Sequence, residues 1–243
     1  MKYALLSDIH SNLEALNTVL AELEALGAGE IICLGDLVGY GANPNEVVEV
    51  AIKKGFRCLL GNHDLVACGM EEPYNFNPWA RHAALWTRGE LTEANKQYLK
   101  GLPFQLELSA QGVAVHGSLE SVDEYILDFQ TAKENFLLLK KQGKSVLFFG
   151  HSHYRVTIVE AGDEILVDRE DELILSEKKL YLINPGAVGQ PRDGDPRAAF
   201  AIYDQEAGII TFRRVEYDID TAGRKILAAG LSPALAHRLF QGL

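Results

Sequence analysis

Apolar runs of strand length alternate with segments of helical period through the first quarter of the chain. Three such runs indicate buried strands: residues 3–7, 30–34 and 56–60. Apolar residues between the first two runs recur every three or four positions and end at Gly27, which predicts a helix. A second helix is predicted from Asn43, as N-cap, and Pro44 to about Lys54. This order of strands and helices predicts a largely parallel sheet.

The start of the first predicted helix contains a possible capping box. Ser11 and Glu14 have the spacing at which a hydroxyl and a carboxylate satisfy each other's backbone N–H groups. We therefore expect Ser11 to cap this helix, directly after Asp8 and His10.

The alternation is interrupted after residue 65. Helices are predicted from Asn77 and Pro78 through Trp86, and from Thr92 through Leu99, so we expect a helical cap insertion at about residues 70–101. The segment is rich in aromatic and basic side chains: Tyr74, Phe76, Trp79, Arg81, His82, Trp86 and Arg88. Trp79 is a candidate to contact a substrate. The alternative is that these aromatic side chains only pack the insertion onto the sheet.

The second half of the chain changes to a pattern of short strands. An antiparallel pair at 104–108 and 113–115, a helix at 131–142 and a buried strand at 145–149 come first. Short strands follow near 156–159, 164–167, 179–183, 198–203 and 209–214, and helices near 220–229 and 233–241 close the chain. A turn-rich loop, 184–194, is expected near the edge of a second sheet. No linker divides the sequence, so residues 1–243 are expected to form a single domain.

Composition narrows the classes of function. The 243 residues carry a formal net charge of -11 and no basic run, which disfavours stable binding to nucleic acid or to an anionic membrane. No apolar run is long enough to span a bilayer. Three cysteines give no disulfide framework, and no signal-peptide pattern precedes the first predicted strand, so a cytoplasmic location is expected.

Residues able to bind metals follow the predicted strands. Each turn alone is equally well explained as an ordinary polar turn. The residues are Asp8, His10, Asp36, Asn62, His63, Asp64, His116, His151 and His153. Because ligands bind outside the carboxyl ends of parallel strands, we expect several of these side chains to meet there. Histidines, carboxylates and one amide at separate turns indicate a metal cluster, and a pair of ions can bind a phosphoryl group. The absence of cysteine at these turns argues against a structural zinc site.

Five short motifs make the pattern more specific. In order along the chain they are Asp8-x-His10, Gly35-Asp36-x-x-Gly39, Gly61-Asn62-His63-Asp64, His116-Gly117 and Gly150-His151-x-His153. Together they resemble the motif blocks of the calcineurin-like metallophosphoesterases, and the segment from Asn184 to Gly189 resembles the small bacterial and archaeal branch of that superfamily. The resemblance implies an α/β fold, a four-layered α-β-β-α sandwich.

The resemblance also implies roles for the motif residues. Asp8, His10 and His153 would hold one divalent metal, Asn62, His116 and His151 would hold a second, and Asp36 would bridge the two. A hydroxide between the metals would attack phosphorus. His63 would contact the phosphoryl oxygens or protonate the leaving group, and Asp64 would orient His63. Manganese is the expected metal, with iron, zinc, nickel or magnesium as alternatives.

The expected substrate is a small phosphate ester or nucleotide, with phosphodiesters first. A dinucleoside polyphosphate hydrolase, a Ser/Thr protein phosphatase and, outside the enzymes, a non-catalytic scaffold protein are the alternatives. Arg192 lies in a loop from which a guanidinium could reach a phosphate, although a surface turn also explains it. The sequence leaves the oligomeric state open.

Overall fold

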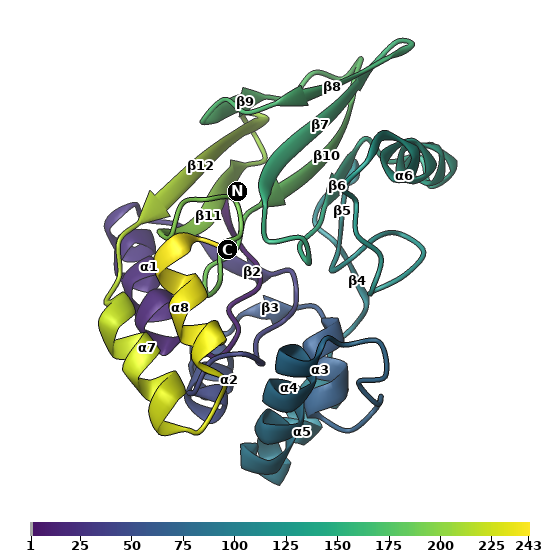
Figure 1. Cartoon of the computed structure of the whole chain (residues 1–243). Coiled ribbons are helices and arrows are strands. Elements are labelled where there is room, and N and C mark those ends of the chain that lie inside the picture. Colours follow the sequence, from purple (N-terminus) through teal and green to yellow (C-terminus); the bar gives the residue numbers. More distant parts are fainter. Residues whose placement is uncertain (1) are drawn as a thin grey trace.

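Two mixed β-sheets face each other in the computed structural model, which describes residues 2–243 (Figure 1). The first sheet has the order β3-β2-β1-β11-β12-β9 and the second β4-β5-β6-β10-β7-β8. The strands of the first sheet are β1 (Lys2–Leu6), β2 (Glu30–Cys33), β3 (Arg57–Cys58), β9 (Glu172–Ile174), β11 (Ala198–Asp204) and β12 (Ile209–Val215). Those of the second are β4 (Gln105–Glu107), β5 (Gly112–Val115), β6 (Val146–Phe148), β7 (Arg155–Ala161), β8 (Glu164–Asp168) and β10 (Leu180–Pro185).

Strand direction agrees with the hydrophobic pattern of the first half. β1, β2 and β3 are parallel, as their connections through α1 (Leu13–Ala25) and α2 (Pro44–Lys54) require. β5, β6 and β10 are also parallel, with α6 (Phe129–Lys141) between β5 and β6. The predicted metal ligands follow the carboxyl ends of strands in these two parallel groups.

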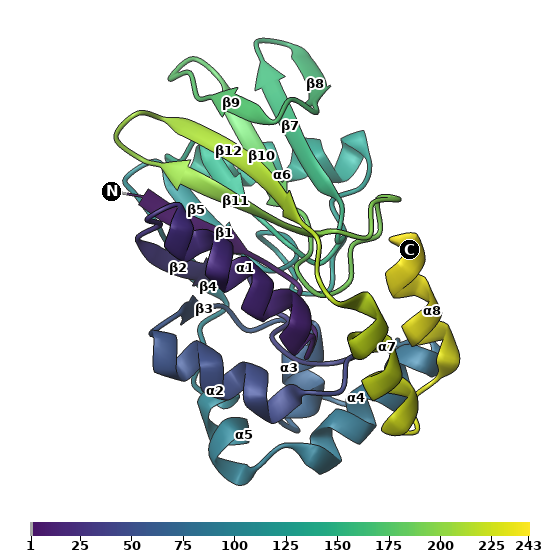
Figure 2. The ribbon, with the colours of Figure 1, turned by 90° about the vertical axis from the view of Figure 1, so that its left-hand side faces the viewer.

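Alternation along β1 explains the four layers. Ala4 and Leu6 pack with α1 and α2 on the outer face, whereas Tyr3 and Leu5 pack between the two sheets. The second sheet likewise packs Leu147 against α6 on its outer face. Figure 2 shows α1 along the outer face of the first sheet, and in Figure 1 α6 lies on the far side of the second. The α-β-β-α sandwich is confirmed.

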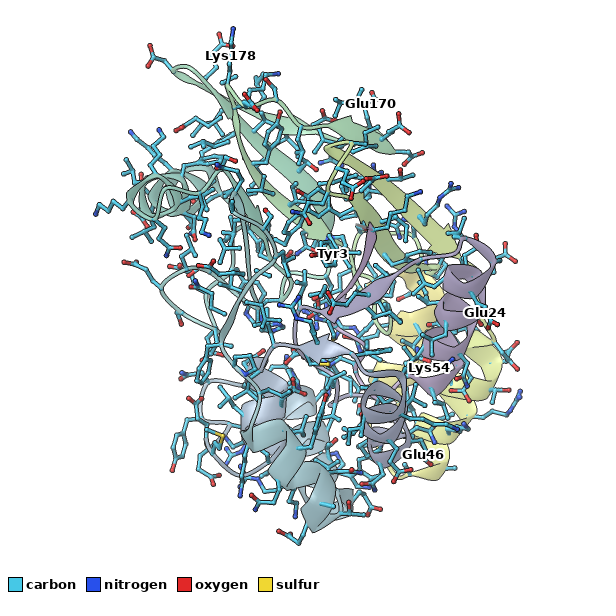
Figure 3. All side chains as sticks on the ribbon, turned by 180° about the vertical axis from the view of Figure 1, so that it is seen from behind. Tyr3, Glu24, Glu46, Lys54, Glu170 and Lys178 are labelled. Atoms are coloured by element: carbon cyan, nitrogen blue, oxygen red, sulfur yellow. The ribbon has the colours of Figure 1, made fainter. Side chains whose placement is uncertain are left out.

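Tyr3 joins the two sheets by a polar contact as well. Its hydroxyl donates to the Leu108 carbonyl at 3.2 Å, and its ring stacks on Tyr203. Figure 3 labels Tyr3 in the middle of the molecule, while Glu24, Glu46 and Lys54 lie on the exposed sides of α1 and α2. Burying the tyrosine ring costs little here because its hydroxyl keeps a partner.

The predicted capping box at Ser11 is wrong. Ser11 has a φ of +55°, and the helix cap is Asn12, whose side chain accepts from the Ala15 N–H at 3.1 Å. Ser11 is displaced from the cap because the turn after β1 takes a left-handed conformation. The predicted N-cap Asn43 is confirmed, and the helices predicted to begin at Asn77 and Thr92 have these residues as their N-caps.

The expected insertion follows α3 (Asn62–Ala67) and contains α4 (Pro78–Glu90) and α5 (Glu93–Lys100). α4 extends beyond Trp86, the expected end, to Glu90. These helices lie below the first sheet in the view of Figure 1, beside α2. Leu91 and Leu99 share the core of α1 and α2, which anchors the insertion to the sheet.

The C-terminal helices, α7 (Ile219–Ala228) and α8 (Pro233–Gln241), pack beside Tyr40 and α4.

Two features of the second half differ from the prediction. The strand β9 was not predicted, and loop 184–194 lies against the end of β1, where the Gly189 N–H donates to the Asp8 carbonyl at 2.9 Å. The loop follows β10, an inner strand, so it is not at a sheet edge. Between residues 2 and 243, no helix has both the length and the apolar character that crossing a bilayer requires.

Candidate metal centre

The strand ends of both sheets bring the predicted ligands into one buried cluster. The first sheet supplies Asp8 and His10 after β1, Asp36 after β2 and Asn62 after β3; the second supplies His116 after β5 and His151 and His153 after β6. Each of these side chains is at most 6% exposed. We call these seven residues the ligand cluster. A set so polar and so deeply buried requires a charge partner.

One half of the cluster contains two carboxylates and two imidazoles. Ligand atoms of Asp8, His10, Asp36 and His153 all lie within 4.8 Å of one another. His10 Nε2 is 3.5 Å from Asp36 Oδ2, and His153 Nε2 is 3.3 Å from Asp8 Oδ1. Such spacing allows these atoms to surround a single cation.

The other half shares a carboxylate with the first. Asp36, His116 and His151 present ligand atoms within 4.8 Å of one another. His116 Nε2 lies 3.3 Å from Asp36 Oδ2 and 3.3 Å from the Asn62 amide oxygen. Asp36 is therefore the residue that belongs to both halves.

Backbone carbonyls orient the imidazoles. The Nδ1–H groups of His10, His116 and His153 donate to the carbonyls of Val38 at 3.0 Å, Leu34 at 2.8 Å and Gln190 at 2.6 Å. Because a carbonyl only accepts, each ring then has its Nε2 facing the cluster, and this nitrogen can bind a metal when it carries no proton. His151 differs, since its Nε2 lies 3.1 Å from the Asp123 carbonyl; when Nε2 donates there, Nδ1 is the nitrogen left to bind a metal.

This orientation fits a bound cation. The Nε2 atoms of His10 and His153 are only 3.1 Å apart, and two lone pairs at that distance repel each other unless a cation or a proton lies between them. Asp8 Oδ2 is buried with no hydrogen-bond partner among the described residues. Nitrogen and carboxylate donors without thiolates suit divalent manganese, iron, zinc or nickel.

The backbone at the ligands is strained. Among residues 2–243, seven non-glycine residues have a positive φ, and five of them are Asp8, His10, Asp36, His151 and His153. Each such conformation costs about 1–3 kcal/mol and is tolerated where the surrounding structure fixes it. The left-handed turn bends the chain sharply off the strand end and directs the side chain into the cluster.

Two motif glycines leave room for the ligands. A Cβ atom at Gly61 would overlap the Asp36 carboxylate, and one at Gly150 would overlap the Ser7 hydroxyl beside Asp8. The glycines are needed here for close approach, because neither has a positive φ.

Burial sets the charge state of the cluster. Burial raises the pKa of Asp8 to about 6 and lowers the pKa of His151 to about 3. It also lowers the pKa values of His10 and His153 well below the usual value for histidine. These three imidazoles are therefore neutral, the form that binds metals.

His116 and Asp36 are the exception. Burial opposes their ionisation, but each holds the other charged: the Asp36 carboxylate raises the pKa of His116 to about 10, and imidazoles, His116 first, hold the pKa of Asp36 well below its usual range.

No hydrogen bond joins Asp64 to His63 among the described residues, so the structure shows no such bond for the orienting role expected of Asp64. The Asp64 carboxylate accepts from the backbone N–H groups of Gly61 at 3.0 Å, Val38 at 3.1 Å and Leu37 at 3.3 Å. Because Asp64 lies in the first turn of α3, its side chain folds back onto the helix start and joins it to the turn that carries Asp36.

His63 instead packs among aromatic rings. Its ring centroid is 4.4 Å from that of Tyr40, 4.6 Å from Phe76 and 4.9 Å from His10. Its Nδ1 is buried with no hydrogen-bond partner among the described residues, and burial lowers its pKa to about 4. The His63 backbone N–H donates to Asp36 Oδ1 at 2.9 Å. Neighbours in space, not Asp64, therefore position the ring.

The two predicted substrate contacts have different outcomes. The Arg192 guanidinium lies over the Tyr40 ring at 5.6 Å, and its backbone N–H donates to the carbonyl of His153 at 3.3 Å, so the structure brings it to the cluster. Trp79, at the start of α4, is 53% exposed and does not line the cleft over the cluster.

A cleft of about 310 Å³ opens over the cluster between the insertion and the loop that follows β5. Its floor includes Asn62, His63 and His151. Seven residues that the sequence did not single out as site residues also line it: Tyr40, Asn75, Phe76, Asn77, Ala80, Asp123 and Tyr125. None belongs to a motif, and only the aromatic content of the insertion pointed to Phe76.

Comparisons with known proteins agree with this geometry. Residues 1–208 match the calcineurin-like phosphoesterase superfamily domain. An uncharacterized protein of Methanocaldococcus jannaschii is 40% identical over 245 residues, covering 98% of this chain and 97% of that protein.

Solved structures show the same fold over the full length. A metallophosphoesterase from Sphaerobacter thermophilus has a TM-score of 0.85 at 37% identity and covers 100% of this chain and 99% of its own. A hypothetical protein from Pyrococcus horikoshii has a TM-score of 0.83 at 20% identity, with 100% and 98% covered. The chain therefore belongs to the calcineurin-like phosphoesterase superfamily and is a phosphohydrolase of that family.

Proposed function

We propose that this phosphohydrolase uses two divalent metal ions to hydrolyse small phosphate esters, with phosphodiesters and small nucleotides as its substrates. The observation that supports a pair of ions is Asp36, whose carboxylate belongs to both halves of the ligand cluster. A carboxylate can bridge two cations about 3.5–4 Å apart, the separation typical of two-metal phosphoesterases.

The proposed ligands follow the two halves of the cluster. Asp8, His10 and His153 would hold one ion, Asn62, His116 and His151 the other, and Asp36 both. Two bound ions would supply a nucleophile derived from water at neutral pH and stabilise the charge of the phosphoryl group. Manganese is proposed first because the donors mix imidazole nitrogen with carboxylate oxygen; iron, zinc and nickel fit nearly as well, and magnesium, which prefers oxygen, fits least.

His63 is proposed to contact the phosphoryl group or the leaving oxygen. Its buried, neutral ring lies beside the ligand cluster, lines the cleft and has an unpartnered nitrogen. A neutral imidazole donates one hydrogen bond to a phosphoryl oxygen. An anionic substrate would raise the pKa of the ring and favour its second role, proton donation to the leaving group. Asp64 is proposed to support the turn beside it through its hydrogen bonds to backbone N–H groups.

Arg192 is proposed to bind a phosphoryl oxygen from the side of the cluster formed by His10 and His153. Its Nη2 donates to the Gln190 side chain at 3.0 Å, while its Nε is buried with no partner among the described residues. A guanidinium with free donors beside a phosphoryl site is suited to anion binding.

The whole chain is proposed to act as one domain. Both sheets supply ligands to the same cluster, so neither sheet could hold the two ions alone.

Metal-dependent hydrolysis tests the proposed function. The protein is stripped of metal, reloaded with Mn²⁺ and assayed with p-nitrophenyl phosphate and bis-p-nitrophenyl phosphate. We expect cleavage of the diester that depends on Mn²⁺, and a loss of at least about 100-fold in Asp36→Asn. Asp163→Asn, a matched change at an exposed position in the turn between β7 and β8, should keep full activity.

Each other outcome has a defined meaning. Full activity in Asp36→Asn, or in the stripped protein, would contradict the two-metal proposal. Activity on the monoester alone would replace the diesterase with a phosphatase. A metal-loaded protein inert towards every ester would favour the scaffold alternative.

A further inference from the structure

The cleft over the ligand cluster has two walls that come from different parts of the chain. One wall is the segment from Asn75 to Ala80, at the start of the insertion, and the other is the loop after β5 with Asp123 and Tyr125. A volume of about 310 Å³ is at the lower end of the range for small-molecule sites. The cleft is therefore large enough for one small organic group beside the phosphoryl site.

Each wall presents an aromatic ring that packs on a residue of the site. Phe76 lies 4.6 Å from the His63 ring, and Tyr125 stacks on His151 at 3.9 Å with an interplanar angle of 24°. No ring contact joins Phe76 to Tyr125 in the described part of the chain, so the space between the walls is open. Tyr125 is 44% exposed, which leaves an apolar ring face available to a ligand.

The polar groups of the cleft select against a highly charged occupant. Its lining contains the amides of Asn75 and Asn77 and the carboxylate of Asp123, but no lysine or arginine. Two cations lie near the Tyr40 side of the cleft without lining it: Arg192, whose guanidinium is 5.6 Å from the centre of the Tyr40 ring, and Arg238, which interacts electrostatically with Arg192 and Tyr40. A polyphosphate chain in the cleft would meet Asp123 without a basic partner, whereas a neutral planar group would meet two rings and two amides.

We infer that the cleft binds a neutral planar aromatic group of the substrate, an aryl group or a nucleobase, between Phe76 and Tyr125. This inference rests on the proposed function, since the ligand cluster below must hold the phosphoryl group. It makes the substrate an aryl or nucleoside phosphate ester and disfavours the dinucleoside polyphosphates. Phe76 and Tyr125 are then residues that determine specificity.

The test compares ligands that differ only in the planar group. Calorimetry on the Mn²⁺-loaded protein measures the affinities of phenylphosphonate and methylphosphonate, neither of which is cleaved. Stacking on one aromatic ring is worth about tenfold in affinity, so phenylphosphonate should bind about tenfold tighter. Adenosine 5′-monophosphate and ribose 5-phosphate form a second pair, which distinguishes a nucleobase from a simple aryl group.

Variants assign the preference to the two rings. The ratio of the affinity for phenylphosphonate to that for methylphosphonate should fall several-fold in Phe76→Ala and in Tyr125→Ala. Tyr125→Phe, which keeps the ring, should retain the wild-type ratio. Trp79→Ala is the matched control, because this exposed aromatic residue of α4 does not line the cleft. Since Phe76 also packs on His63, the Tyr125 variants keep the test independent of that contact.

Two results would overturn the inference: a ratio near one in the wild type, or a ratio that neither alanine variant changes. A preference in the phosphonate pair alone would restrict the cleft to aryl groups, and a preference in both pairs would extend it to nucleobases. Failure of the proposed function is seen separately, as the absence of Mn²⁺-dependent ester hydrolysis, because the binding ratio needs no turnover.

Discussion

The ligand cluster lies at the ends of strands from both sheets, whereas the walls of the cleft above it are connecting segments. In the cluster, five residues adopt a strained left-handed backbone and each side chain is at most 6% exposed. In the walls, Tyr125 is 44% exposed, and Asn75 and Asn77 are exposed as well. The comparison indicates that the chemistry is fixed by the sheets, while the identity of the substrate is left to loops that can change without disturbing it.

Of the changes considered, metal binding should show the largest difference between the ligand cluster and the walls of the cleft. Bound ions relieve the repulsion among buried donors, so Mn²⁺ at about 1,000 times its dissociation constant should raise the free energy of unfolding by about 4 kcal/mol. Thermal unfolding with and without EDTA measures this.

Hydrogen exchange then shows which segments are stabilised by Mn²⁺ binding. We expect slower exchange at the turns after β1, β2 and β6 and little change in residues 123–125. Equal protection of both regions would remove the distinction between them.

A pair of glycine substitutions sharpens the same contrast. Gly61→Ala should cost about 1–3 kcal/mol of stability and weaken Mn²⁺ binding, because the added methyl group overlaps the Asp36 carboxylate. Gly89→Ala, in α4 with open space around it, should stabilise the protein by about 0.5–1 kcal/mol and leave metal binding unchanged. Chemical denaturation measures both; equal effects would contradict the packing account.

A substitution of Asp64 tests whether this residue stabilises the turns around the ligand cluster or orients His63, the proposed substrate contact. Asp64→Asn replaces one of the two carboxylate oxygens, which accept from three backbone N–H groups, and should cost about 1–3 kcal/mol of stability. Since no hydrogen bond joins the carboxylate to His63 among the described residues, the NMR titration of the His63 ring should keep its midpoint in the metal-free protein. A large shift of that midpoint would restore the orienting role that the motif implied.

The sequence predicts the cluster better than the cleft for a physical reason. Asp8, Asp36 and His116 directly follow recognisable strands or sit one turn beyond them, and parallel strand ends must meet, so residue type and position were sufficient. The partner of Asp64 could not be predicted, because it depends on how the turn after β2 packs on α3. Ser11 failed as a cap because the ligand turn before it takes a left-handed conformation.

The cleft depends on contacts between distant segments. Phe76 and Tyr125 share no motif and are separated by the insertion and two strands, so only the folded chain brings them to one space. Trp79 was an equally reasonable candidate from its residue type, and only its place on the exposed side of α4 removes it.

The most direct test of the account is the number of metal ions bound per chain. Equilibrium dialysis against Mn²⁺, followed by elemental analysis, should find about two ions in the wild type and no more than one in Asp36→Asn, because that residue alone belongs to both halves of the cluster. A single ion in the wild type, or the same number in both proteins, would contradict a site bridged by Asp36.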